Sequence, residues 1–209
     1  EKEKKSKVDI SQIIKDNKKI FSIFPGSRLS EINILIPILF KFVKMMNEKY
    51  KDLFFVFHST TEHVKMIQNL LLKEGFKNCG AISDEKIKSH ILESSMFAVA
   101  KSGTISLEIS KAKVPSIIIY KMGIINFFIV KMLVKVKFAN IINIAANREV
   151  IPELLQSKCN PNNIFKTVDN LLKDKEAMDN QIRNIQDIIG DFKTDKSTDI
   201  AASVLNKHI

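Results

Sequence analysis

The sequence predicts an α/β protein built on a Rossmann-like parallel sheet with helices on both faces. Three observations lead to this expectation. Short β-rich apolar runs alternate with stretches of helical periodicity, which is typical of crossover units between parallel strands. Only six Gly and five Pro in 209 residues favour long regular elements over a loop-rich β fold. Hydrophobic residues make up 45% of the chain, which is enough for a substantial core.

The first strand is expected at 19–24, where the run KIFSIF ends at a Pro-Gly turn. Beyond Ser27, apolar residues recur every three or four positions, which predicts a helix through Met46. The alternation then predicts strands at 53–57, 79–82, 96–100 and 115–120, and helices at 61–76, 84–95 and 105–112.

After Tyr120 the sequence predicts only helices, at 124–136, 160–174, 176–191 and 197–208. The domain organisation that follows is a linker or partial helix at 1–18, one Rossmann-like domain at 19–175, and C-terminal helices at 176–209 that pack on it. No apolar run reaches the roughly 18 residues that a membrane-spanning helix needs.

The stretch 124–138 combines an apolar body with three lysines, Lys131, Lys135 and Lys137. Such a helix suits a membrane interface, but it also suits packing on the sheet with lysines at its rim. Both interpretations stay open. The chain begins with Glu1 rather than Met, so it is expected to be a fragment.

The formal net charge is +10, which suggests an anionic partner. Only three of the 33 basic residues are arginine, and the abundance of Lys, Ile and Asn also fits drift toward A/T-rich codons. Nucleic acid is disfavoured, because its binders rely on arginine and interleaved aromatic residues, and this chain has no Trp. Two cysteines are too few for a disulfide framework and indicate a reducing compartment.

Two turns at the expected carboxyl ends of strands carry the most informative polar residues, because parallel sheets bind ligands there. In the first, Gly26 permits close approach of an anion, Ser27 offers a hydroxyl, and Arg28 offers a two-pronged guanidinium at a helix N-terminus. Glu31 would either cap that helix or orient Arg28. An ordinary turn with a surface arginine is the alternative.

The second turn is Ser102-Gly103-Thr104, which suits a phosphate. Glu108 lies one helical turn beyond Thr104, where a carboxylate can accept hydrogen bonds from two sugar hydroxyls. A threonine-capped helix with a solvated glutamate is the alternative.

Other polar residues carry less information. The polar segment from Asn143 to Gln156 is either part of a binding cleft or a loop with a capped helix. His58 and His63 are considered as catalytic groups and set aside. No acidic pair or Cys/His cluster has metal-ligand spacing, so neither a metal nor another cofactor is expected.

Five short motifs in fixed order resemble the lipid-A-disaccharide synthase family of Gram-negative bacteria. They are PGSR-x-SE at 25–31, SGT-xx-LE at 102–108, P-x(4)-Y-K at 115–121, LVK at 133–135 and N-x(4)-RE-xx-PELLQ at 143–156. The resemblance runs from about Ile20 to Leu172.

The resemblance implies the C-terminal, nucleotide-binding half of an inverting glycosyltransferase of the GT-B type. That enzyme moves 2,3-diacylglucosamine from its UDP conjugate to 2,3-diacylglucosamine 1-phosphate (lipid X), releases UDP, and makes the lipid A disaccharide. The N-terminal half would supply the acceptor face and the catalytic base. The implied location is cytoplasmic, peripheral on the inner face of the inner membrane, with a homo-oligomer as an option.

By position, the resemblance also implies site residues. Arg28 would stabilise the leaving diphosphate and is the catalytic residue expected in this half. The UDP-sugar would contact Gly26, Ser27, Arg28, Ser102, Gly103, Thr104, Glu108, Asn143, Arg148, Glu153 and Gln156.

The chain departs from the family pattern twice, with Ile142 where Pro is expected and Asn147 where Gly is expected. Asn tolerates positive φ better than most residues, so the second change is mild. Two alternative functions stay open: another UDP-sugar enzyme of the same fold, such as a peptidoglycan-type transferase or an epimerase, and a non-catalytic basic domain that binds membranes.

Overall fold

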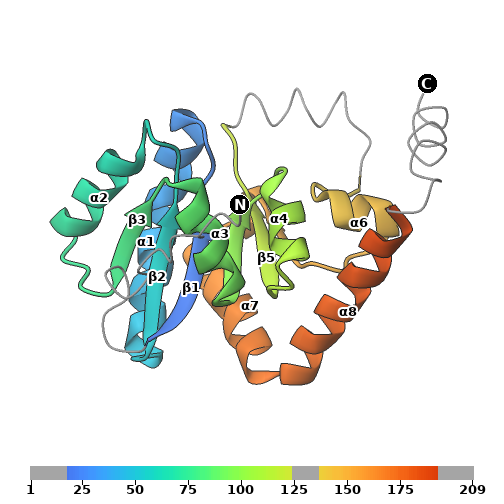
Figure 1. The fold of residues 1–209 in the computed structure, drawn as a ribbon. Helices are drawn as coiled ribbons and strands as arrows, with labels where there is room; N and C mark the ends of the chain where they lie inside the picture. Colours follow the sequence, from blue (N-terminus) through green and yellow to red (C-terminus); the bar gives the residue numbers. More distant parts are fainter. Residues whose placement is uncertain (1–17, 124–136, 193–209) are drawn as a thin grey trace, which may run out of the picture.

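The computed structural model describes residues 18–123 and 137–192, which form a six-stranded sheet flanked by helices (Figure 1). The strand order is β3-β2-β1-β4-β5-β6, and every neighbouring pair is parallel. The Rossmann-like fold expected from the sequence is therefore confirmed.

The elements are bounded as follows. The strands are β1 (Lys19–Phe24), β2 (Leu53–His58), β3 (Cys79–Ile82), β4 (Ser95–Lys101), β5 (Ser116–Tyr120) and β6 (Glu153–Leu155). The α-helices are α1 (Leu29–Lys49), α2 (Val64–Lys73), α3 (Glu85–Glu93), α4 (Ile105–Lys111), α6 (Ile141–Ala146), α7 (Pro161–Lys173) and α8 (Lys175–Phe192), and a 3-10 turn, η2, spans Gln156–Lys158.

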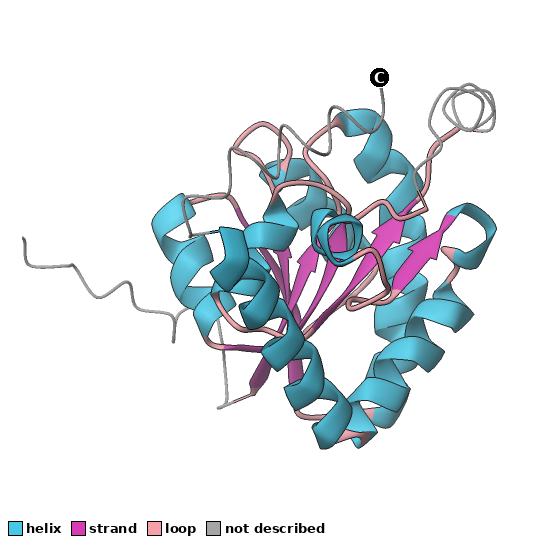
Figure 2. Ribbon diagram, turned by 90° about the vertical axis from the view of Figure 1, so that its right-hand side faces the viewer, coloured by secondary structure: helices cyan, strands magenta, loops and turns pink. Residues whose placement is uncertain are grey.

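Helices cover both faces of the sheet (Figure 2). One apolar cluster packs α1, α2 and α7 against the first face. Two further clusters pack α3, α4, α6 and α8 against the second face. A strand that is buried on both faces of a sheet has apolar side chains at successive positions, with no alternation of apolar and polar residues. The runs LFFVF and SIIIY have this pattern, and both form strands.

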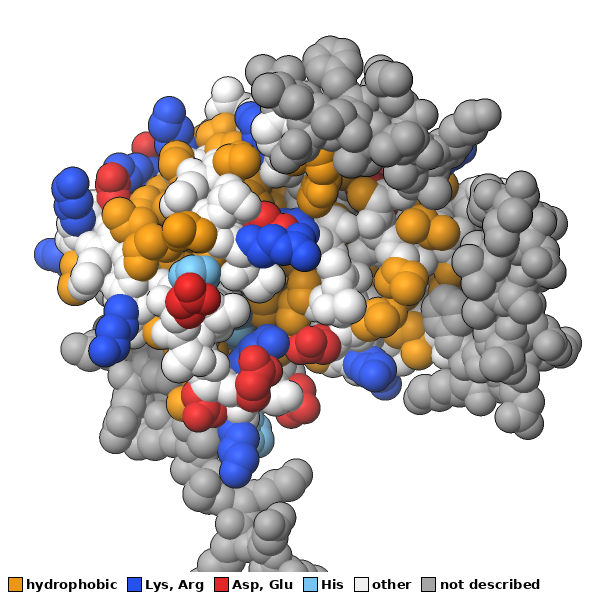
Figure 3. Space-filling view, turned by 90° about the horizontal axis from the view of Figure 1, so that it is seen from above, with side chains coloured by type: hydrophobic (Ala, Val, Ile, Leu, Met, Phe, Trp, Pro, Cys, Tyr) orange, Lys and Arg blue, Asp and Glu red, His pale blue; other side chains and the backbone are white. Residues whose placement is uncertain are grey.

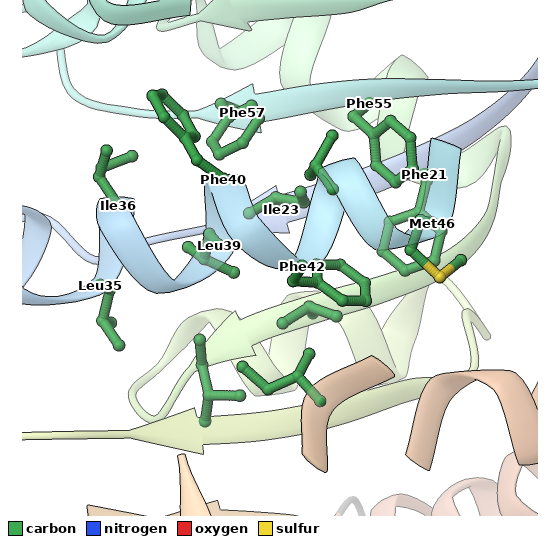
Figure 4. Packing of buried hydrophobic residues seen from close by; sticks show 14 of the residues in the cluster. Phe21, Ile23, Leu35, Ile36, Leu39, Phe40, Phe42, Met46, Phe55 and Phe57 are labelled. Atoms are coloured by element: carbon green, nitrogen blue, oxygen red, sulfur yellow. The ribbon is translucent and has the colours of Figure 1, made fainter. Parts of the chain in front are cut away.

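Phe21 lies at the centre of the larger cluster and links β1 to its neighbours (Figure 4). Its ring is 5.2 Å from that of Phe55 on β2, 5.5 Å from that of Phe97 on β4 and 5.9 Å from that of Phe42 on α1. Aromatic pairs at these spacings add to the free energy gained by burial alone.

The expectation that strands end at Tyr120 is wrong. Residues Glu153–Leu155 form β6, which pairs with β5 in parallel, and Ile141–Ala146 form α6. A strand of three half-buried residues in a polar segment has too short a pattern for periodicity to reveal. Asn147 ends α6 with a φ of 50°, which agrees with the expectation that Asn replaces Gly there at little cost.

Gln181 of α8 bonds to the start of β5, at a position that β6 is too short to reach. Its buried side-chain amide accepts from the backbone N–H of Ser116 at 2.8 Å and donates to the C=O of Ser116 at 2.9 Å. Two residues along β5, the N–H of Ile118 is bonded to the C=O of Pro152. The amide of Gln181 thus takes the place of one missing strand residue on the β6 side of β5 and fixes α8 to the sheet.

A buried carboxylate joins α7 to the end of α1. Asp169 accepts from the hydroxyl of Tyr50 at 2.7 Å and forms ion pairs with Lys49 and Lys173. Burial opposes the charge of Asp169, but the hydrogen bonds from Lys173, Lys49 and Tyr50 hold its pKa well below the usual range. Burial, together with Asp169, raises the pKa of Tyr50 to about 12.

Some expectations fall outside the described residues. They are the linker at 1–18 except for its last residue, the LVK motif and the helix at 124–136, and the helix at 197–208. Within the described ranges, no helix has both the length and the hydropathy needed to cross a bilayer.

Replacing Gln181 with Leu should lower the free energy of unfolding by about 2–4 kcal/mol, because two buried backbone groups of Ser116 lose their partner. Urea denaturation measures the change. Gln186→Leu is the matched control, since the carbonyl of Ser110 that Gln186 contacts also accepts from the N–H of Lys113. Equal losses in the two variants would contradict the role of Gln181.

Candidate functional site

A cavity of about 220 Å³ opens at the carboxyl ends of the strands, where the strand order reverses at β1. The chain leaves β1 toward β2 through α1 on one face, and it leaves β4 toward β5 through α4 on the other. The two connections diverge, which leaves a crevice between them. Its lining comes from the ends of β1, β2 and β4 and from the first turns of α1, α3 and α4. In Figure 3, which looks onto this edge, basic and acidic side chains lie next to one another.

The turn after β1 is built around Gly26. Its φ of 108° is one that L-residues rarely adopt, and a Cβ placed there would lie 2.6 Å from Oε2 of Glu31. Glycine is therefore favoured here for two reasons: other residues rarely adopt this φ, and their Cβ would collide with the side chain of Glu31. Gly26 and the exposed Ser27 both line the cavity.

Arg28 is the N-cap of α1, and its side chain lies at the rim of the cavity without lining it. The side chain of Arg28 is 78% exposed, and its Nη1 lies 3.3 Å from Oε1 of Glu31. The same oxygen of Glu31 forms an ion pair with Lys101, the last residue of β4, whose Nζ lies 2.9 Å away. Glu31 therefore fulfils both roles expected for it: it accepts from the backbone N–H of Arg28 at the start of α1, and it pairs with the guanidinium of Arg28. Through Lys101 it also ties the β1 turn to the end of β4.

Two basic groups and a helix terminus stabilise the charge of Glu31. Burial alone would raise its pKa, but the hydrogen bond and charge of Lys101 and the backbone N–H groups of Arg28 and Ser27 hold it below the ordinary value. Glu31 is therefore a carboxylate at neutral pH and a poor candidate for a general base.

The turn after β4 and the first turn of α4 bring Ser102, Gly103, Thr104 and Glu108 to the cavity together. A Cβ on Gly103 would meet no heavy atom within 4 Å, so the backbone here is open to a ligand. The hydroxyl of Ser102 donates to the C=O of Ala139 at 2.6 Å. Ser102 thus holds the segment before α6 against the turn.

Two lysines, Lys88 and Lys101, lie beside these carboxylates. Nζ of Lys88 lies 3.3 Å from the carboxylate of Glu108 and 3.2 Å from that of Glu85. Lys88 and Lys101 are each only 17% exposed at the side chain. The cavity lining therefore pairs two lysines with three carboxylates, those of Glu31, Glu85 and Glu108.

His58, the last residue of β2, is 3% exposed and stacks on Phe24 with ring centroids 4.1 Å apart. A chain of hydrogen bonds fixes its tautomer. Oγ of Ser95 donates to the C=O of Ile91 at 2.7 Å, so it accepts from Oγ of Ser22, also at 2.7 Å. Ser22 has then used its only proton and accepts from Nε2 of His58 at 2.9 Å. The proton of the neutral ring is therefore on Nε2, and Nδ1 carries a lone pair.

Burial lowers the pKa of His58 to about 3, and the charge of Lys88 acts in the same direction. The ring is therefore uncharged at neutral pH. His63 is buried as well, but it belongs to the start of α2 and does not line the cavity.

The structure does not bring the four expected residues of the 143–156 segment into the cavity. Asn143 is fully buried, and all its hydrogen-bonding capacity is used: Oδ1 accepts from the N–H groups of Val150 and Ile151, and Nδ2 donates to the C=O of Ile151 and to Glu153. Glu153 also accepts from the N–H groups of Ala139 and Asn140, at 2.7 and 2.9 Å. Both side chains therefore hold together the loop that Ser102 contacts.

The remaining two residues of this segment lie apart from the cavity. Arg148 is exposed and donates to Asn184 of α8 at 2.9 Å. Gln156 follows β6 with a φ of 51°, a strained value for a residue with a side chain, and its buried Nε2 has no partner among the described residues.

Several lining residues were missed although a signal for them existed. Ser59 and Thr60 directly follow β2, and Lys101 directly precedes the Ser-Gly-Thr turn, so the strand-end rule that found the two turns also applies to them. Lys88 carries no such signal, because its position depends on how α3 packs over the sheet.

The model of the lipid-A-disaccharide synthetase family matches residues 1–204. The lipid-A-disaccharide synthase of Sulfurihydrogenibium sp. (strain YO3AOP1) is 34% identical over 184 residues, which cover 83% of this chain and 47% of that protein. The same enzyme of Rickettsia typhi is 34% identical over 198 residues, covering 93% of this chain and 51% of that protein. The chain thus spans about half the length of the curated relatives it matches.

Solved structures share the fold at low sequence identity. A UDP-GlcNAc 2-epimerase from Neisseria meningitidis, bound to UDP-GlcNAc, has a TM-score of 0.62 and 17% identity, covering 95% of this chain and 47% of its own. The ADP-heptose heptosyltransferase II of E. coli has a TM-score of 0.57 and 8% identity, covering 80% and 50%. At such identity the likeness shows the fold alone.

The buried His58 should make stability depend on pH. Its pKa is about 3 in the folded chain against 6.5 when exposed, so its contribution is complete above pH 6.5 and is lost as the pH falls toward 3. Between about pH 6.5 and 5 the free energy of unfolding should fall by up to about 1.4 kcal/mol per pH unit. Urea denaturation across this range measures the slope.

The variant His58→Phe keeps the ring on Phe24 and removes the titrating group, so its slope should be flatter by about one proton. A slope unchanged in His58→Phe would contradict the assignment.

Proposed function

This chain belongs to the lipid-A-disaccharide synthetase family, and on that premise we propose that it is the nucleotide-sugar-binding half of a glycosyltransferase. The complete enzyme transfers 2,3-diacylglucosamine from its UDP conjugate to 2,3-diacylglucosamine 1-phosphate and releases UDP. One observation carries the proposal. The two glycine turns after β1 and β4 line a single cavity at the reversal of strand order, and both turns belong to the motifs of the family resemblance.

In this proposal the diphosphate of the donor lies between the two turns. The 21-residue helix α1 presents the positive end of its dipole to it. Ser27 and Thr104 add hydroxyl donors, and the open backbone at Gly103 allows close approach. Glu108 accepts from the ribose hydroxyls, and Lys88 holds it in place.

Negative charge builds on the β-phosphate as the bond to the sugar breaks, so groups that stabilise this charge accelerate transfer. Arg28 is the residue to which we assign this role, because it lies at the rim of the turn with an exposed guanidinium. Lys101 supports it from the end of β4. Glu31 holds both cations in position, which reduces the reorganisation needed when the leaving group forms.

The segment 143–156 acts indirectly in this proposal. Asn143 and Glu153 fix the loop at 139–140, whose carbonyl oxygen holds the hydroxyl of Ser102. Arg148 and Gln156 lie apart from the cavity, and we assign contacts with the donor sugar to them only in the complete enzyme.

The N-terminal half supplies the acceptor site and the general base. The diacylated substrates reside in a bilayer, so we place the enzyme in the cytoplasm, peripherally on the inner face of the inner membrane. A homo-oligomer is compatible with this arrangement, and nucleic acid is not a partner in it.

Calorimetric titration should show that this chain binds UDP more tightly than CMP at moderate salt. Gly103→Ala should weaken UDP binding about tenfold or more without changing stability, because the added methyl group meets no protein atom and obstructs only a ligand. Gly26→Ala is unsuitable for this test, since it strains the turn itself.

Arg28→Ala should likewise weaken UDP binding by about tenfold, the loss expected for one charge-assisted contact. Arg183→Ala is the matched control, because it removes the same charge from the exposed surface of α8. Equal and weak binding of UDP and CMP by the unsubstituted chain, falling steeply with salt, would favour a non-catalytic basic domain instead.

A carboxylate that competes for Lys88 should oppose nucleotide binding. Glu85→Gln leaves Lys88 paired with Glu108 alone and should tighten UDP binding about two- to threefold, an effect that diminishes with salt. Glu93→Gln changes the same charge on the same helix away from the cavity and should have less effect. Weaker binding in Glu85→Gln would show that Glu85 contacts the ligand itself.

A further inference from the structure

The carboxyl end of β2 brings three consecutive polar side chains, His58, Ser59 and Thr60, to the wall of the cavity. Nδ1 of His58 and the hydroxyl oxygens of the other two are buried, and none of these atoms has a hydrogen-bond partner among the described residues. Buried polar atoms are almost always paired in folded proteins, so three unpaired ones in one wall indicate a group that is absent.

The chemistry of these atoms restricts what that group can be. The hydrogen-bond chain through Ser22 and Ser95 leaves Nδ1 of His58 with a lone pair and no proton. It therefore needs a donor, and the oxygen of an ionised phosphate offers only lone pairs. Lys88 acts on this ring through its positive charge, which disfavours a cation in the same place. An uncharged N–H or O–H group satisfies both restrictions.

The order of the strands places this wall beside the two glycine turns. In the sheet β1 lies between β2 and β4, so the end of β2 lies about 5 Å from the end of β1, on the side away from β4. A ligand whose diphosphate lies between the turns after β1 and β4 therefore reaches the end of β2 with an uncharged part. The hydroxyls of Ser59 and Thr60 can both donate to and accept from that part.

We propose that His58, Ser59 and Thr60 form a neutral subsite that binds an uncharged N–H or O–H donor of the nucleotide sugar, beside the phosphate turns. The donor group belongs either to the sugar or to the nucleoside. This inference rests on the proposed function, and the experiments below separate the failure of one from the failure of the other.

Affinity measurements with three probes test the subsite. UDP-N-acetylglucosamine carries a sugar and a nucleoside, UDP carries the nucleoside, and inorganic pyrophosphate carries neither. His58→Phe and Thr60→Val should each weaken binding of UDP-N-acetylglucosamine about fivefold or more, the loss of one hydrogen bond. Binding of pyrophosphate should change less than about twofold.

Two matched controls exist in the chain. His63→Phe replaces another buried histidine that does not line the cavity. Ser110→Ala removes a hydroxyl that is also buried and unpaired among the described residues but lies away from the cavity. Both should bind all three probes as the unsubstituted chain does, and thermal unfolding of every variant checks that it is folded.

The pattern of losses identifies the source of the donor. A loss for both UDP and UDP-N-acetylglucosamine assigns it to the nucleoside, and a loss confined to UDP-N-acetylglucosamine assigns it to the sugar. Unchanged affinity for both, or an equal loss for pyrophosphate, would overturn the subsite while leaving the proposed function intact.

Nitrogen-15 NMR of the histidine rings gives a second readout that does not depend on nucleotide affinity. The free chain should show Nδ1 of His58 without a proton, and N-acetylglucosamine or uridine at millimolar concentration should shift its resonance. If none of the three probes binds, the proposed function fails, and this titration still decides the subsite. A protonated Nδ1, or no shift with either compound, would overturn it.

Discussion

The central position of β1 is the constraint on which the rest of the structure depends. Because β1 is bonded to β2 on one side and to β4 on the other, the connections that leave these strands cover opposite faces of the sheet. Phe21 secures this arrangement, since its ring contacts side chains of both neighbouring strands and of α1. The crevice at the carboxyl end of β1 is the geometric consequence, and the cavity with its two glycine turns lies there.

Charge pairing within the cavity explains how cations are kept in an arrangement suited to an anion. Two half-buried lysines in one cavity would repel each other if their charges were not compensated. Glu108 compensates Lys88 at 3.3 Å, and Glu31 compensates Lys101 at 2.9 Å. These pairs reduce the net attraction for a phosphate, and in return they fix each ammonium group in direction and distance. A site organised in this way loses affinity for anions in general and gains selectivity for a ligand with the matching geometry.

The polar segment after the glycine turns shows how a functional motif can have a structural role. Asn143 satisfies four groups in a buried loop. The carboxylate of Glu153 that Asn143 contacts also accepts from the N–H groups of Ala139 and Asn140, just before α6. Each of these contacts lies between residues close in sequence, so the motif folds as one unit. Among the described residues, the hydrogen bond from the hydroxyl of Ser102 to the carbonyl oxygen of Ala139 connects this unit to the cavity wall.

The sequence by itself determined the parallel sheet, five of its six strands and both glycine turns, because these depend on local periodicity and, at Gly26, on a backbone conformation that favours glycine. It could not place β6, whose three residues are a strand only because β5 offers them an edge. Nor could it place Lys88, the tautomer of His58 or the amide of Gln181, since each depends on a residue at least 20 positions away. Contacts across such separations are set by how helices pack over the sheet, and that packing is a property of the tertiary structure alone.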